Sequence, residues 1–243
     1  MEEKDLKTSP KQRIIIGLIA FLLLGSSMAV YVAIVMGNDT IDYSKMTTAQ
    51  LESAYEKSYS EYTARSAELS QTYFDEFSGY RSEVKGFNSA AANSEGVTYR
   101  DLKEGDGAEV KNGEYSAYYI GWCSDETIFD TSFDSYESPT SLNAPLAIEE
   151  NSLIAGWYDG VLGMKLGGVR EITIPGELAY GDTYEICGGY NSPLKFLVFA
   201  VPNDEQLTSI SKSLNDIYKA MMVAYSQSYS ATSDSSAAET SGE

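Results

Sequence analysis

The stretch LIAGWYDGVLGMKLGGVREITIPGELAYG, residues 153–181, decides the fold of this chain. Apolar residues recur in its first part at the three- and four-residue spacing of a helix, and Ser152 precedes them as a candidate N-cap. From residue 169 to 174 the period changes to two, which predicts a half-covered strand that ends at Pro175-Gly176. A helix, a glycine-rich hinge, a strand and a loop therefore follow one another.

Trp157 on that helix and Tyr180 on that loop are the candidate binding residues. The strand between them is expected to bring the tyrosine close to the tryptophan, so that Trp157 forms the base of a binding site and Tyr180 one side of it. Taken alone, Trp157 reads as an ordinary core residue, because a lone tryptophan in a helix is usually packed inside. The rest of the chain decides between a core position and a binding site.

Composition excludes several classes of function. The chain has 243 residues, of which 43% are hydrophobic, enough for an ordinary core in one or two domains. The net charge of −19 argues against nucleic acid as a partner, because proteins that bind phosphate backbones cluster Lys and Arg. With no histidine, Ser-His-Asp and Cys-His catalysis and His-ligated zinc are excluded. Two cysteines alone do not build a structural zinc site.

Residues 14–36 form an uncharged apolar run that is expected to span a membrane, since about 35 Å of helix matches a hydrocarbon core. A cleaved signal peptide is the alternative, but its apolar region is shorter and no small-residue cleavage site follows here. Basic residues in 1–13 precede the run, and Asp39 and Asp42 follow it. We therefore expect a single-pass protein of the cell membrane, with a cytoplasmic amino terminus and the remainder outside. Periplasm and outer cell surface both remain open.

Two further segments carry helical stripes of apolar residues. Residues 37–93 are expected to hold a long amphipathic stalk helix, followed by a linker at SAAANS from Ser89. The stripe consists of Leu51, Tyr55, Tyr62, Leu69, Tyr73, Tyr80, Val84 and Phe87. Spacer, homodimerising helix and helix packed on the globular domain are open roles, and we favour a spacer that also packs. Residues 204–225 are expected to form a second amphipathic helix on the stalk, and 226–243 a disordered acidic, serine-rich tail.

Residues 94–203 carry the alternating segments of a globular domain. These are VTYRDLK from Val97, YSAYYIGW from Tyr115, TIFDT from Thr127, VREITIP from Val169 and LKFLVFAV from Leu194. Together with the short helix they predict an α+β fold, in which a mostly antiparallel sheet wraps one helix. Such packing leaves an apolar pocket where the helix start, the strand ends and a long loop meet, and pockets of that kind bind ligands.

GVTYRDLKEGDG, YYIGW, IFDTS, the stretch 153–181 and PLKFLVFAV occur in the order and spacing of the FKBP family of peptidyl-prolyl cis/trans isomerases, which residues 94–203 resemble. The resemblance does not cover the membrane segment, the stalk, the second helix or the tail. It implies an FKBP-like fold and a pocket that catalyses rotation about X-Pro bonds of unfolded or exported polypeptides, with no metal and no cofactor.

The resemblance also implies the residues of the pocket. Catalytic roles fall to Asp130, to the Tyr180 hydroxyl and to the backbone N–H of Ile154. The substrate-binding residues are Tyr119, Phe129, Leu153, Trp157 and Phe199. Any of the strand aromatics alone would be plain packing, so the expectation depends on the whole set. Ala144 and Leu146 stand where the family often has larger aromatics, which leaves sensitivity to the family's macrolide inhibitors open.

Such a pocket acts by desolvation. Rotation about an X-Pro bond faces a barrier of about 18–20 kcal/mol, because amide resonance is lost. The twisted amide has less charge separation than the planar one, so an apolar site favours it relative to water. The alternative function is a non-catalytic proline-peptide binding module or holdase chaperone that uses the same pocket at the membrane surface.

Cys123 follows the YIGW segment, and Cys187 lies in the loop after Tyr180. Both belong to the part expected outside the cell, where disulfides persist. A bridge would tie the substrate loop to the sheet. Two independent free thiols are the alternative, and the sequence leaves both open.

Overall fold

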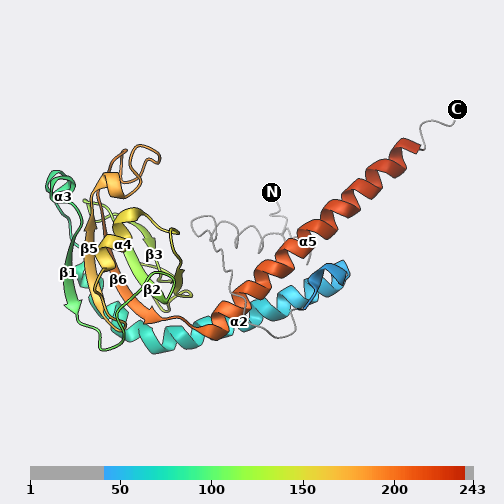
Figure 1. Cartoon of the computed structure of the whole chain (residues 1–243), viewed down its shortest axis with the longest axis horizontal. Coiled ribbons are helices and arrows are strands. Elements are labelled where there is room, and N and C mark those ends of the chain that lie inside the picture. Colours follow the sequence, from blue (N-terminus) through green and yellow to red (C-terminus); the bar gives the residue numbers. More distant parts are fainter. Residues whose placement is uncertain (1–40, 239–243) are drawn as a thin grey trace, which may run out of the picture. The chain divides into compact units, whose positions relative to one another are not determined.

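The alternating segments form antiparallel strands in the order β1-β5-β6-β2-β3 (Figure 1). This computed structural model describes residues 41–238. The strands are β1 (Thr98–Lys103), β2 (Tyr115–Trp122), β3 (Ile128–Thr131), β5 (Val169–Ile174) and β6 (Leu194–Pro202). A further strand, β4 (Leu146–Ile148), pairs with the first residues of β2 and was not expected from the sequence.

The helices are α2 (Thr48–Ser78), α3 (Ser89–Glu95), α4 (Ala155–Val161) and α5 (Glu205–Ala238), with 3-10 turns η1 (Tyr43–Lys45), η2 (Gly79–Glu83) and η3 (Gly176–Leu178). The predicted α+β architecture with an antiparallel sheet is confirmed. Within residues 41–238, no helix combines the length and the apolar character needed to cross a bilayer. The predicted span 14–36 and the predicted cytoplasmic tail 1–13 lie outside the described residues.

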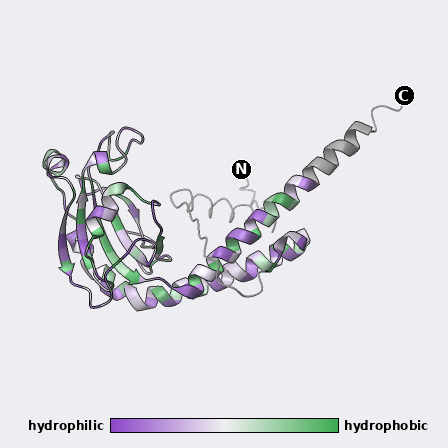
Figure 2. Ribbon diagram, viewed as in Figure 1, coloured by the Kyte–Doolittle hydropathy of each residue, from purple (hydrophilic) through white to green (hydrophobic). Residues whose placement is uncertain are grey.

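The two faces of the sheet carry two separate hydrophobic cores. On β6, Phe196 and Val198 pack with α4 in the first core, whereas Leu197 and Phe199 belong to the second core. This alternation follows from the period of two along a strand. Figure 2 shows hydrophobic residues along the strands, and hydrophobic residues alternating with hydrophilic ones along α2 and α5.

The last turns of α2 cover the face of the sheet opposite α4. Phe77 is fully buried, stacks on Phe133 with ring centroids 5.4 Å apart and lies 5.8 Å from the ring of Phe199. Tyr73, one turn earlier, contacts Phe199 edge-on at 5.6 Å. Phe77 is absent from the predicted stripe, yet it is the most buried residue of this contact. The end of α2 is therefore part of the core of the globular domain.

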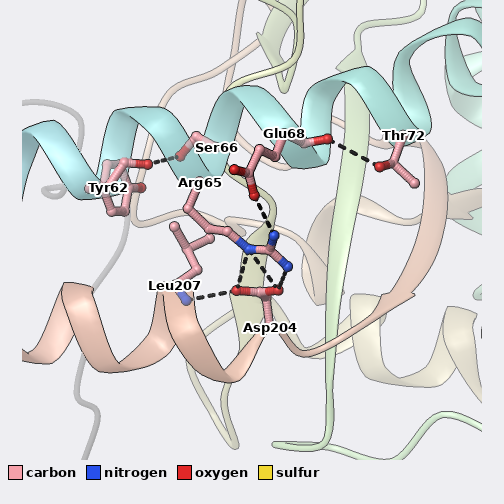
Figure 3. A network of polar contacts seen from close by, with 7 residues as sticks. All are labelled: Tyr62, Arg65, Ser66, Glu68, Thr72, Asp204 and Leu207. Carbon is pink, nitrogen blue, oxygen red and sulfur yellow. Dashed lines mark hydrogen bonds and ion pairs between the residues drawn. The ribbon is translucent and has the colours of Figure 1, made fainter.

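The earlier part of α2 packs along α5. The buried residues of α5 recur at three- and four-residue spacing, as on one face of a helix, and are Leu207, Ile210, Leu214, Ile217 and Met221. Figure 3 shows the polar contact beside them. The Nε–H of Arg65 on α2 donates to both carboxylate oxygens of Asp204 at 3.1 Å, and Oδ1 of Asp204 accepts from the backbone N–H of Leu207 at 2.7 Å. Asp204 thus caps the start of α5 and joins it to α2.

Two predicted irregular segments are helical instead. SAAANS from Ser89 is not a linker but most of α3, which begins after Asn88, whose side chain accepts a bond from the Ala91 N–H. The helix α5 continues to Ala238, where a disordered tail was expected after Tyr225. Once packing has nucleated a helix, each further residue adds a hydrogen bond at small cost, so a polar sequence can prolong it.

Ser152 does not cap the helix that follows it. Its hydroxyl donates to the carbonyl oxygen of Glu149 at 2.9 Å, and α4 begins after Ile154 with no side-chain cap. The local turn competes with the cap for the same hydroxyl. The start of α4 therefore keeps backbone N–H groups that no side chain occupies.

Candidate active site

Aromatic rings from three strands, β2, β3 and β6, meet around Trp157 of α4. Its side chain is 2% exposed, and its indole N–H donates to the hydroxyl of Tyr115 at 3.0 Å. The ring of Phe196 lies 5.3 Å away and that of Tyr119 6.0 Å away, both edge-on. Phe129 on β3 meets Phe196 at 5.5 Å. Edge-to-face contacts of this kind hold rings in fixed orientations and form a rigid apolar floor.

Two glycines allow this close packing. A Cβ atom on Gly121 would lie 2.6 Å from the Phe129 ring and 2.8 Å from the Phe196 ring. A Cβ atom on Gly156 would lie 2.3 Å from Cγ2 of Ile174. The first glycine admits the two rings over β2, and the second lets α4 approach β5.

Phe199, predicted to line the pocket, does not belong to it. It lies 1% exposed in the second core, against Phe77 and Tyr73 of α2. Residues three apart on a strand point to opposite faces, so Phe196 is the β6 phenylalanine on the face of Trp157. Strand parity shows from the sequence that only one of the two phenylalanines can line the pocket, and the structure identifies it as Phe196.

The polar edge of the site is formed by Tyr119 and Asp130. The Tyr119 hydroxyl donates to Oδ2 of Asp130 at 2.6 Å, while Oδ1 accepts from the backbone N–H of Thr131 at 2.8 Å. Burial, and then the charge of Asp130, raise the pKa of the Tyr119 hydroxyl well above its usual value. The hydroxyl therefore stays protonated near neutral pH, and the carboxylate is held by two donors.

Tyr180 lies near enough to Asp130 and Tyr119 to interact electrostatically with both, and 37% of its surface is exposed. Burial of the rest of the residue, followed by the charge of Asp130, raises the pKa of its hydroxyl. Leu153 and Ile154 pack against the same core from the start of α4. Leu153 N–H donates to the hydroxyl of Tyr158 at 3.0 Å, whereas the N–H of Ile154 finds no acceptor within residues 41–238.

The loop between β5 and β6 is fastened at several points. Cys123 and Cys187 form a disulfide with Cα atoms 5.4 Å apart, so of the two alternatives left by the sequence the structure has the bridge. At the loop base, Asn93 of α3 accepts from the N–H of Gly176 at 2.8 Å and donates to the carbonyl oxygen of Asn191 at 3.2 Å. Asn93 thus holds both ends of the loop, a role that sequence reasoning missed.

Comparison with known proteins places this site in a family. The family model described as FKBP-type peptidyl-prolyl cis-trans isomerase matches residues 106–202. An FK506-binding protein of Neisseria meningitidis serogroup B is 38% identical over 107 residues, which are 44% of this chain and 92% of that protein. The chain belongs to the FKBP-type isomerase family. It is therefore a peptidyl-prolyl cis-trans isomerase, as the sequence resemblance implied.

Other FKBP relatives match a similar share of the chain. A probable FK506-binding protein of Corynebacterium glutamicum is 42% identical over 88 residues, 36% of this chain and 70% of that protein. Among solved structures, AtFKBP13 is 28% identical, covering 44% of this chain and 93% of its own, with a TM-score of 0.36. The match to the family model, residues 106–202, includes neither α2 nor α5.

In this FKBP-type isomerase the structure gathers most of the predicted site on one face of the sheet. The first core and its margin include Tyr119, Phe129, Leu153, Ile154 and Trp157. Asp130 joins them through Tyr119, and Phe196 takes the place predicted for Phe199. Within the described residues, no three His, Cys, Asp or Glu side chains come together in a way that could hold a metal ion.

Proposed function

We propose that this isomerase acts on X-Pro bonds of exported polypeptides, from the outer side of a membrane that residues 14–36 span. The observation that carries the proposal is the enclosed floor of Trp157, Phe129 and Phe196 beside a hydrogen-bonded Asp130. A proline ring packed on that floor leaves its amide bond in an apolar surrounding. In this surrounding the twisted amide is stabilised relative to the planar amide. Each step of about 1.4 kcal/mol in this difference in free energy increases the rate tenfold.

Two donors are positioned to hold the peptide. The N–H of Ile154 lacks a partner within residues 41–238, and it binds a substrate carbonyl oxygen at the start of α4. The Tyr180 hydroxyl, protonated at neutral pH as tyrosine ordinarily is, binds a second carbonyl oxygen. Asp130 keeps the Tyr119 hydroxyl engaged, so this polar pair enters the complex already satisfied. The reaction requires no nucleophile and no proton transfer.

The outer location is supported by two features. The disulfide Cys123–Cys187 is of a kind that persists in oxidising compartments and is rare in the cytosol. Residues 14–36 are uncharged and follow a basic segment, which favours a cytoplasmic amino terminus. Protease treatment of intact cells tests this location, because an outward domain is cleaved and a cytoplasmic one is protected.

Catalysis is tested by exchange measurements on a short Leu-Pro peptide with the full chain in detergent. We expect acceleration that falls at least tenfold in Trp157→Ala and in Asp130→Ala. Leu162→Ala is the matched control, because Leu162 follows the same helix but is 73% exposed. Unchanged exchange rates with folded protein would contradict the proposal. Retained peptide binding in that case would assign the alternative function, a non-catalytic binding module or holdase.

We do not extend the proposal to a homodimer through the stalk helix. The buried side of α2 is already occupied within one chain, by α5 along its earlier turns and by the sheet at its end. Proline-containing unfolded polypeptides remain the proposed partners.

A further inference from the structure

The loop between β5 and β6 presents large aromatic side chains to solvent. Tyr184 and Tyr190 are 61% and 58% exposed, beside the partly exposed Tyr180. The rings of Tyr180 and Tyr184 lie 5.6 Å apart, so this aromatic surface continues directly from the proposed peptide site. Exposed aromatic groups next to a binding site are typical of contact surfaces.

This surface is ordered before any ligand arrives. The N–H of Asn191 donates to the carbonyl oxygen of Gly181 at 2.8 Å, and its side chain donates to Asp182 at 2.9 Å. The disulfide at Cys187 fastens the same loop to the end of β2. A ligand that binds here therefore loses little free energy to ordering the loop.

The segments around the site carry charge of one sign. Residues 123–163 contain eight Asp and Glu residues and residues 175–194 contain three, and neither stretch contains Lys or Arg. On the loop itself Glu185, next to Tyr184, is exposed. The first cation after the loop, Lys195, is bound to Glu171 at 2.8 Å. The local potential therefore favours a cationic ligand.

We propose that Tyr184 and Glu185 form a docking surface for a cationic side chain of the substrate, so that the isomerase favours polypeptides with Arg or Lys within a few residues of the proline. The Tyr184 ring receives the cation on its face, and Glu185 supplies the opposite charge. This inference deepens the proposed function and rests on it, because it names the class of substrate that the same site selects.

The test uses peptides that share one Leu-Pro bond and differ at a single position, two residues before or two residues after the proline, where they carry Arg, Gln or Glu. For each peptide, kcat/KM for exchange and Kd are measured with the full chain. At low ionic strength we expect Arg to be favoured over Glu by about fivefold or more. Near 1 M salt, where the Debye length is about 3 Å, the ratio should fall below about twofold.

Variants separate the local surface from the net charge of the protein. Glu185→Gln and Tyr184→Ala should each reduce the Arg-to-Glu ratio by at least half. Glu56→Gln and Tyr59→Ala are the matched controls on α2, since both residues are exposed and each substitution is identical in kind. These controls should leave the ratio unchanged.

Equal kcat/KM and equal Kd for the Arg and Glu peptides overturn the inference. It is also overturned if Glu185→Gln and Glu56→Gln lower the Arg-to-Glu ratio of kcat/KM equally. The two proposals fail separately. If no peptide shows accelerated exchange, the proposed catalysis is wrong, whereas the series of Kd values still decides whether a cationic residue is preferred.

Discussion

Phe196 and Phe199, three residues apart on β6, lie on opposite faces of the sheet. The first contacts Trp157 at the floor of the site, and the second contacts Phe77 of α2. Both are almost completely buried, so burial does not distinguish their roles. Their roles differ because they lie on opposite faces of the strand.

Substitution by leucine at the two positions should therefore have different effects. Each of Phe196→Leu and Phe199→Leu should lower the free energy of unfolding by about 1–2 kcal/mol. Only Phe196→Leu should also lower kcat/KM, by about tenfold, because it alters the surface that receives the proline. Urea unfolding and peptide exchange measure the two quantities. A larger loss of kcat/KM in Phe199→Leu would show that the faces are assigned wrongly.

The predicted domain 94–203 should not fold well when separated from α2. Removal of α2 exposes the second core, which includes Tyr118, Trp122 and Phe199. In a protein consisting of residues 41–238, Phe77→Ala should lower the free energy of unfolding by about 3–5 kcal/mol, because it leaves a cavity in this core. We expect residues 94–203 alone to aggregate or to unfold without a cooperative transition, as judged by size-exclusion chromatography and urea denaturation. A monomeric fragment with the same urea midpoint as residues 41–238 would refute this.

Reduction of the disulfide should weaken both stability and binding. The bridge joins residues 64 positions apart, and closing a loop of that length stabilises by about 4 kcal/mol in the chain-entropy treatment. The double variant Cys123→Ser/Cys187→Ser should therefore melt earlier and bind peptide more weakly, because the loop with Tyr180 is freed at one point. Reductant should lower the melting temperature of the parent protein and leave the double variant unaffected. Equal response of both to reductant would rule out the disulfide as the cause.

The contact between Arg65 and Asp204 should make the α2–α5 pair sensitive to acid. The hydrogen bonds from Arg65 lower the pKa of Asp204, so this contribution to stability is present above the unfolded pKa of about 3.9 and is lost as the pH falls through the folded value. Asp204→Asn should cost about 1 kcal/mol at pH 7. Urea midpoints between pH 6 and 2 should converge for the two proteins at the acid end. Parallel curves would exclude Asp204 as the titrating group.

Local patterns in the sequence were sufficient for most of the sheet. The predicted strand segments correspond to β1, β2, β3, β5 and β6, each of which is at least four residues long. β4 was not predicted, because its three residues, Leu146–Ile148, are too few to establish a period. The roles of Trp157, Tyr119 and Asp130 came from the family motif, which fixes residue types at a set spacing, whereas the hydrogen bond between Tyr119 and Asp130 was not predicted.

Contacts between distant segments left no such pattern. Asn93 and Gly176 are bonded across 83 residues, and Phe77 meets Phe199 through the packing of a helix on a sheet. Neither contact is implied by periodicity in its own segment, because each depends on where the two elements dock. The wrong assignment of Phe199 has a related cause, because β6 is buried on both faces and its sequence does not show which face meets α4.

Alternate residues of β6 belong to the two separate cores, and this limits which sequence changes the protein can tolerate. A single inserted or deleted residue in that strand would turn every following side chain over, exchanging the groups that receive the ligand for those that hold the helix. Both tasks would be lost in one step, whereas exchanges of one side chain for another affect them one at a time. Length variation among descendants of this sequence should therefore be confined to the connections and absent from the central strands.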